Sequence, residues 1–178
     1  MNTDHRTDLP AGFDPSSRVW IYQGHRPFSS EERTQSQPLL KSFIQTWASH
    51  GTPVKGHAGI YYDQFIILMA DETASGVSGC STDSSVHLIK QIEQQTGIRF
   101  FDRLNLAFHI DQQVRLIPLT QLPEALSAGI ITTNTLYFDN TIRTKEELEL
   151  KWPIPLKDSW LGTRYLSGSA PVGATSVK

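Results

Sequence analysis

The sequence contains a single cysteine, Cys80, in 178 residues, and this scarcity limits its chemistry and its setting. One cysteine cannot form an intramolecular disulfide or a Cys-x-x-Cys redox pair, and a lone thiol is more typical of a reducing compartment than of the extracellular space. We therefore expect a cytoplasmic protein whose fold does not depend on disulfides.

Long hydrophobic runs are also missing. The longest one, Phe65 to Ala70, is far shorter than the roughly 18 to 20 apolar residues that a membrane-spanning helix needs. The N-terminal residues have mixed charge and are not followed by an apolar stretch, so a secretory signal peptide is not expected. The sequence therefore predicts no membrane association.

Positive and negative side chains are nearly balanced in number. There are 16 Lys and Arg residues against 18 Asp and Glu residues, and the formal net charge is −2. Nucleic acids and anionic membrane surfaces are usually bound by basic patches, and no block of like charges occurs here. We therefore predict no nucleic-acid partner, and the composition makes no prediction of the oligomeric state.

The spacings of common metal and nucleotide motifs are absent. The six histidines show neither an HxH nor an HExxH pattern, and none has zinc-ligand spacing to Cys80. A Walker motif, GxxxxGK[ST], requires a lysine that the glycine- and serine-rich segment at residues 75–85 does not contain. We expect no metal, no cofactor and no P-loop ATPase activity.

The patterns that are present predict an α+β fold. Aromatic and β-branched residues at 18–23 predict a first strand, and Ser29 with Glu32 has the spacing of a capping box at the start of a helix. The apolar stripe at residues 39–47 belongs to this helix, and Pro38 either kinks it or marks a second start. A strand followed by a long helix is thus expected at the N-terminal end of the fold.

A β-hairpin is predicted next, over residues 54–71 with its turn at Asp63-Gln64. Its second arm is apolar on both faces, which is typical of a central strand that is covered on each side. A helix capped by Asp83 or Ser84 should then run to about residue 96. Further expected elements are strands at 104–110, 114–117 and 135–138, helices at 123–128 and from Thr144, and an irregular segment from Trp152 to Trp160.

The order β-α-β-β-α-β over the first 110 residues fits a ferredoxin-like core with C-terminal additions, within a mixed or mostly antiparallel sheet that has helices packed on it. We predict one α+β domain at residues 18–165. Residues 1–17 and 166–178 have few large apolar side chains, so they are predicted to be flexible tails.

The segment from Ser75 to Ser85 is the strongest candidate site, because it follows a buried strand and opens a helix. Glycines let backbone N–H groups approach a bound anion in such a place. A competing and equally weighted interpretation is a plain strand-to-helix connection capped by Asp83. The predicted ligand-binding residues are Gly76, Gly79, Ser81, Asp83, Ser84, Asp71 and Arg103.

Cys80 is the candidate nucleophile of this segment, because a helix N-terminus favours the thiolate. His87 or His109 would be its base. The phosphatase spacing CX5R is absent, since Val86 stands where the arginine would be. The competing interpretation, a small cysteine that packs under the loop, carries more weight.

A few segments of this chain match a known pattern: Val19-Trp20-Ile21-Tyr22-Gln23, His50-Gly51, Ser78 to Ser85, Phe101-Asp102-Arg103 and Trp152 to Trp160. With them the sequence resembles a family of short uncharacterised bacterial proteins, some of which carry an automatic label of ABC-transporter ATPase. The resemblance covers roughly residues 18–160, the extent of one domain. It brings no catalytic residue with it, and the chain has neither the Walker lysine nor an LSGGQ-type signature helix.

Three functions follow from these patterns. The leading hypothesis is binding of a small anionic ligand, or of a partner's acidic group, at the Gly76 to Ser85 loop. The first alternative is a thiol-dependent transferase or hydrolase with Cys80 as its nucleophile. The second is a structural or assembly subunit that uses its tryptophans as a contact surface.

Overall fold

The computed structural model describes residues 9–49, 51–71 and 79–166, without the side chains of residues 79–82. Helices and antiparallel sheets are both present, which confirms the α+β class. The chain forms two compact units. Unit 1 comprises Met1–Asn105 and Asp139–Trp152, and unit 2 comprises Leu106–Phe138 and Pro153–Lys178. The predicted domain boundaries 18–165 stay a prediction.

Unit 1 is built on a three-stranded sheet with the order β1-β5-β4, in which neighbouring strands are antiparallel. Its strands are β1 (Arg18–Gln23), β4 (Lys55–Tyr61) and β5 (Phe65–Asp71). The predicted hairpin is confirmed, since Tyr62 and Asp63 turn the chain at positive φ between its arms. Every residue of β5 is buried, so this strand is the covered central one that its composition predicts.

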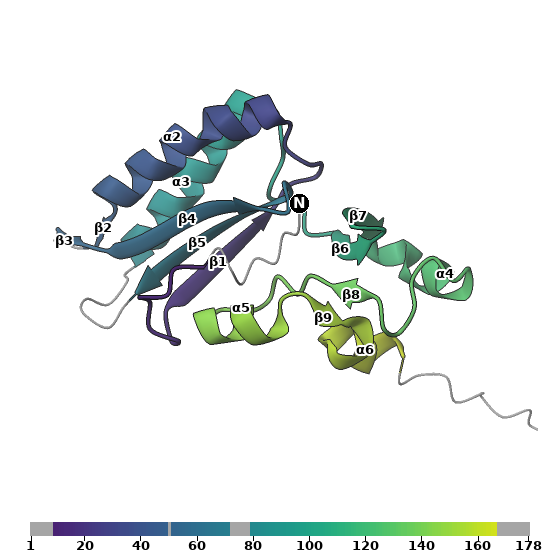
Figure 1. The fold of residues 1–178 in the computed structure, drawn as a ribbon. Helices are drawn as coiled ribbons and strands as arrows, with labels where there is room; N and C mark the ends of the chain where they lie inside the picture. The colour runs from purple at the N-terminus through teal and green to yellow at the C-terminus, as the bar shows by residue number, and fades with distance from the viewer. Residues whose placement is uncertain (1–8, 50, 72–78, 167–178) are drawn as a thin grey trace, which may run out of the picture. The chain divides into compact units, whose positions relative to one another are not determined.

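Two long helices, α2 (Ser30–Thr46) and α3 (Gly79–Thr96), lie side by side on one face of this sheet (Figure 1). The capping box is confirmed: the Glu32 N–H donates to Ser29 Oγ at 3.2 Å, and the Ser29 N–H donates to Glu32 Oε2 at 2.8 Å. Pro38 lies inside α2, which continues through it as one helix. The stripe at residues 39–47 therefore belongs to a single element.

The helix α3 begins earlier than predicted, at Gly79, so Asp83 and Ser84 lie inside it and do not cap it. Several small polar residues in a row can each cap a helix, and their spacing alone does not select one. A tertiary contact helps to fix the first turns, because a 3.1 Å hydrogen bond joins Ser85 Oγ to the Tyr22 hydroxyl on β1. The predicted end at Thr96 is confirmed, and Gly97 follows at φ +69°.

The opposite face of the sheet is covered by α5 (Lys145–Lys151), by Trp152 and by residues 9–17. The Trp152 ring meets Phe65 edge-on, with centroids 4.9 Å apart. Leu9 is buried, and the Lys145 N–H donates to Ser17 O at 2.9 Å. Residues 9–17, which the sequence placed in a tail, thus pack on unit 1.

The four-stranded ferredoxin-like sheet is not confirmed. The three strands of unit 1 have the antiparallel arrangement of its first three strands, but the position beside β1 that a fourth would take is filled differently. There the Val19 N–H donates to Arg143 O at 2.8 Å, and Arg18 forms an isolated bridge with Thr144. The strand β6 (Asn105–Ile110) pairs in another sheet.

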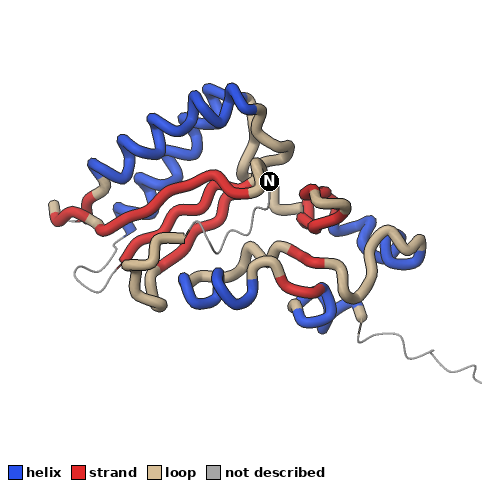
Figure 2. The backbone as a smooth tube through the Cα atoms, viewed as in Figure 1, coloured by secondary structure: helices blue, strands red, loops and turns tan. Residues whose placement is uncertain are grey.

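Unit 2 contains a four-stranded sheet with the order β7-β6-β8-β9. Its short elements, separated by tan loops in Figure 2, pack around a core that includes Phe108, Leu122 and Leu161. The predicted irregular segment after Trp152 contains one short strand and one 3-10 turn. The remaining bounds are β7 (Gln113–Pro118), η1 (Leu119–Gln121), α4 (Leu122–Ser127), β8 (Leu136–Tyr137), β9 (Ile154–Pro155), η2 (Leu156–Asp158) and α6 (Trp160–Tyr165).

A two-residue hairpin, β2 (Ala48–Ser49) and β3 (Thr52–Pro53), follows α2 in unit 1. Within the part of the chain that the structure covers, neither α2, α3 nor a shorter helix has the length and hydropathy of a transmembrane segment.

Candidate functional site

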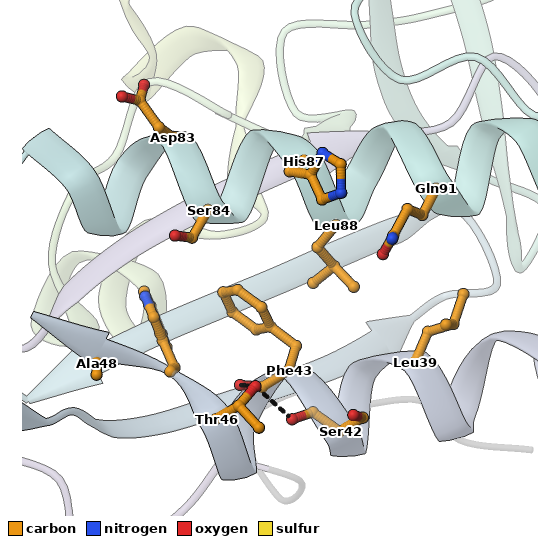
Figure 3. A pocket seen from close by; sticks show the side chains of 11 residues that line it. Leu39, Ser42, Phe43, Thr46, Ala48, Asp83, Ser84, His87, Leu88 and Gln91 are labelled. Carbon is orange, nitrogen blue, oxygen red and sulfur yellow. Dashed lines mark hydrogen bonds between the residues drawn. The ribbon is translucent and has the colours of Figure 1, made fainter. Parts of the chain in front are cut away.

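A groove of about 560 Å³ runs between α2 and α3 (Figure 3). It lies toward the end of the sheet where β4 begins and β5 ends, because α2 leads into β4 and α3 follows β5. The lining residues are Leu39, Ser42, Phe43, Thr46, Trp47 and Ala48 from α2 and its end, and Asp83, Ser84, His87, Leu88 and Gln91 from α3.

Trp47 is closely packed in the wall of this groove. Its ring packs against Phe43 and Trp20, with centroid distances of 4.8 and 5.7 Å. A Cβ on Gly56 would lie 2.7 Å from Trp47 Cε3, so only glycine lets strand β4 approach the indole this closely. The indole is therefore held on three sides.

The indole Nε1–H of Trp47 is buried and has no hydrogen-bond acceptor among the residues that the structure describes. The residue as a whole is 3% exposed. A buried donor without an acceptor costs about 1 to 3 kcal/mol, and native proteins leave few such groups. Trp47 also lines the groove, but its nitrogen is covered by protein atoms, so an acceptor atom of a bound molecule reaches it only if the groove wall shifts.

The walls of the groove combine apolar and polar side chains. In Figure 3, Ser84, Leu88 and Gln91 extend from α3 toward α2, and Phe43 extends from α2 toward α3. Asp83 points away from α2, so its carboxylate is turned from the facing wall. Such a mixture, an apolar bed with a few placed polar groups, is typical of small-molecule sites.

Three of the predicted site residues, Asp83, Ser84 and His87, line this groove together. Gly79, Cys80 and Ser81 belong to the first turn of α3, but their side chains are outside the described part of the structure, as is Gly76 altogether. Of the predicted site residues, the structure thus brings together those that lie on α3 and have a described side chain.

Asp71 does not line the groove. Its carboxylate is buried and forms a 2.8 Å ion pair with Lys55 Nζ at the end of the β4/β5 hairpin. The same ammonium group donates to Gly12 O and lies 5.0 Å from the centre of the Phe13 ring. Lys55 thus ties the N-terminal segment to the sheet, and Asp71 has a structural role as its ion-pair partner.

Arg103 is exposed and also lies outside the groove, in the connection between α3 and β6. Its charge acts on Tyr22: burial raises the pKa of the Tyr22 hydroxyl, and the hydrogen bond to Ser85 and the positive charge of Arg103 oppose that rise. The neighbouring Asp102 accepts a hydrogen bond from the Leu104 N–H at 2.9 Å and therefore supports the loop backbone.

The alternative base His109 belongs to unit 2, where its ring meets Phe138 edge-on at a centroid distance of 6.4 Å. Pairing of Cys80 with either histidine stays a prediction. No cluster of three or more His, Cys, Asp or Glu side chains that could hold a metal ion occurs among the described residues.

Sequence reasoning missed the α2 wall, in particular Ser42, Thr46 and Trp47. The apolar stripe of α2 identified Trp47 as core, and it is core, but a sequence carries no signal that its N–H would lack an acceptor. Thr46 Oγ1 donates to Ser42 O at 3.0 Å, a local bond that any helical threonine can form.

Comparison with known proteins adds no relationship to this geometry. No family model matches the chain, and no significant match was found among curated proteins or solved structures. The resemblance described from the sequence therefore stays a prediction, and a function has to be argued from the groove itself.

Proposed function

We propose that this protein binds a small ligand with an apolar body and an anionic end in the groove between α2 and α3. The observation that carries the proposal is the buried Trp47 Nε1–H, a hydrogen-bond donor without an acceptor among the described residues, in the wall of that groove. The volume of about 560 Å³ is within the range of small-molecule sites.

The polar end of the ligand is anionic because the groove offers it donors, and the one carboxylate of the lining, Asp83, points away from the facing wall. The indole N–H can only donate, and the hydroxyl of Ser84 and the imidazole of His87 can also donate. The groove lies beside the amino-terminal part of α3, an 18-residue helix whose dipole places roughly half a positive charge at Gly79. A carboxylate or phosphate suits this end.

The rest of the ligand is apolar because apolar side chains line the groove beside these donors. Leu39, Phe43 and Leu88 line the groove together with the indole of Trp47. Burial of apolar ligand surface on them contributes roughly 25 cal/mol per Å². Aromatic or branched aliphatic carboxylates and phosphate monoesters are the substances to test first.

The experiment is a thermal-shift screen of such compounds, with inorganic phosphate and acetate as anions that lack an apolar body. A ligand that binds only the native state stabilises it, by about 2.7 kcal/mol at a concentration of 100 times Kd. Aromatic or aliphatic anions should raise Tm more than the small anions. A flat response to every compound at millimolar concentration would end the proposal.

A matched pair of variants locates the site. Ser42→Trp places a large side chain in the groove, whereas Thr34→Trp places it on the same helix at an exposed position outside the groove. Ligand stabilisation should be lost in the first variant and kept in the second. Equal loss in both would place the ligand elsewhere.

The thiol-dependent enzyme and the structural or assembly subunit remain alternative proposals. A thiol enzyme would place its substrate beside Cys80 in the first turn of α3. The cytoplasmic location rests on the single cysteine alone.

A further inference from the structure

A second groove, of about 580 Å³, lies between α2 and the strand β4. It differs from the first groove because one of its walls is a strand and not a helix. The residues from 56 to 61 all contribute to it. On the helix side the lining residues are Arg33, Gln37, Leu40, Lys41, Ile44 and Gln45.

The strand β4 is at the edge of its sheet. In the described part of the chain it pairs only with β5, so its other side presents backbone N–H and C=O groups without a strand partner. Gly56, Ala58 and Gly59 leave much of this edge without bulky side chains. Proteins usually protect a long edge strand, so an open one beside a groove is a template for an added strand.

The helix α2 provides a polar wall parallel to this edge. Arg33, Gln37, Lys41 and Gln45 follow one another at intervals of four residues, which places them in one row along the helix. The row is about 18 Å long at 1.5 Å per residue. The strand from residue 56 to 61 is about 17 Å long at 3.3 Å per residue, so the two walls match in length.

The charge of the groove is positive. Its lining contains Arg33 and Lys41 and no carboxylate. Arg33 is paired with Asp63, whereas Lys41 is exposed and has no ion pair with any residue in the described ranges. Two further lining residues of β4 pair with each other: His57 Nε2 and the Tyr61 hydroxyl are 2.8 Å apart, and burial lowers the pKa of His57.

We propose that this groove takes an extended peptide of about six residues that carries acidic side chains and adds to β4 as a fourth strand. Its backbone pairs with the free edge of β4, and its carboxylates face Lys41 and the amides of Gln37 and Gln45. Backbone pairing gives the affinity, and the charge of the helix row gives the preference for acidic sequences.

The test uses a labelled six-residue peptide of alternating valine and glutamate, blocked at both ends. Two matched peptides accompany it, one with lysine in place of glutamate and one with N-methyl groups on alternate backbone amides. Binding is followed by fluorescence anisotropy, and hydrogen exchange reports the backbone amides of residues 56–61. The Val–Glu peptide should bind saturably and slow the exchange of these amides, and the other two should not.

Charge variants assign the contact. Lys41→Glu should weaken binding of the Val–Glu peptide by roughly fivefold or more, and Lys90→Glu, the same change at an exposed site on α3, should leave it within about twofold. Several outcomes would overturn the proposal: no binding by the Val–Glu peptide at millimolar concentration, equal binding by the lysine peptide, or unchanged exchange at residues 56–61. Self-association that protects these amides without peptide would assign the edge to a second copy instead.

Discussion

At the scale of single residues, the account depends on how tightly Trp47 is held. The indole has Phe43, Trp20 and the backbone of Gly56 around it, so it cannot rotate its N–H toward another acceptor without losing these contacts. Burial and position in a helix stripe were predictable for this residue. The missing acceptor was not, because it depends on which atoms of distant segments arrive beside the ring.

Gly56→Ala tests that packing. The added Cβ would lie 2.7 Å from Trp47 Cε3 and 3.2 Å from Ile44 Cδ1, and a held ring cannot move away cheaply. We expect a loss of about 1 to 3 kcal/mol in the free energy of unfolding, measured by urea denaturation. Gly12→Ala is the control, because nothing lies within 4 Å of its Cβ position. Equal stability of the two variants would show that the indole is loosely held.

Cys80→Ser separates binding from thiol chemistry. If the groove is a binding site, this variant should keep the ligand affinity of the wild type, and the native thiol should react slowly with a small alkylating agent at neutral pH. Rapid labelling whose rate rises with pH and levels off below the free thiol pKa of about 8.5 would favour the enzyme hypothesis.

At the scale of elements, local chemistry decided what could be predicted. Ser29 and Glu32 begin α2 as their spacing required, and the apolar residues of β5 made it the central strand. The start of α3 was misplaced by about one turn, because several small polar residues in a row can each cap a helix and their spacing does not select one. The α2 wall of the groove was missed because it exists only where two helices far apart in the sequence meet.

Glu32 gives the cap of α2 a pH dependence. The hydrogen bond from Arg26 and the Ser29 N–H lower the pKa of its carboxyl to about 2, below the unfolded value of about 4.3. A lowered pKa adds stability that is fully present above the unfolded value and is lost as pH falls from about 5 to about 2.

Glu32→Gln should therefore be less stable than wild type by roughly 1 kcal/mol at pH 7, and the difference should shrink toward pH 2. The measurement is urea denaturation across this pH range. Glu31→Gln, in the same first turn of α2, is the control. A stability difference that does not change between pH 7 and pH 2 would refute the role of this carboxylate.

At the scale of the whole molecule, the α+β class followed from the order of patterns, whereas the division into two compact units did not. Unit 1 takes its last helix, α5, from beyond residue 138, and a sequence does not show that so late a segment covers the first sheet. Composition also did not show that residues 9–17 belong to unit 1. This segment has few apolar side chains, but Leu9 is buried and Phe13 lies beside Lys55.

Truncation tests this boundary. A chain that begins at Arg18 loses the burial of Leu9, the contacts of Lys55 with Gly12 and Phe13, and two backbone acceptors, Ser17 O and Pro15 O, for the first turn of α5. We expect it to unfold with about 2 to 4 kcal/mol less free energy than a chain that begins at Leu9. Equal stability would mean that residues 9–17 form no part of unit 1.

The central claim is that a ligand in the α2/α3 groove accepts the hydrogen bond of Trp47. The chain has four tryptophans, so a ¹H–¹⁵N spectrum contains four indole Nε1–H signals, and Trp47→Phe identifies the one from Trp47. Titration with the compound that raises Tm most should move this signal downfield in a saturable way, with smaller changes in the other three. A compound that stabilises the protein in the groove but leaves the Trp47 signal in place would contradict the account.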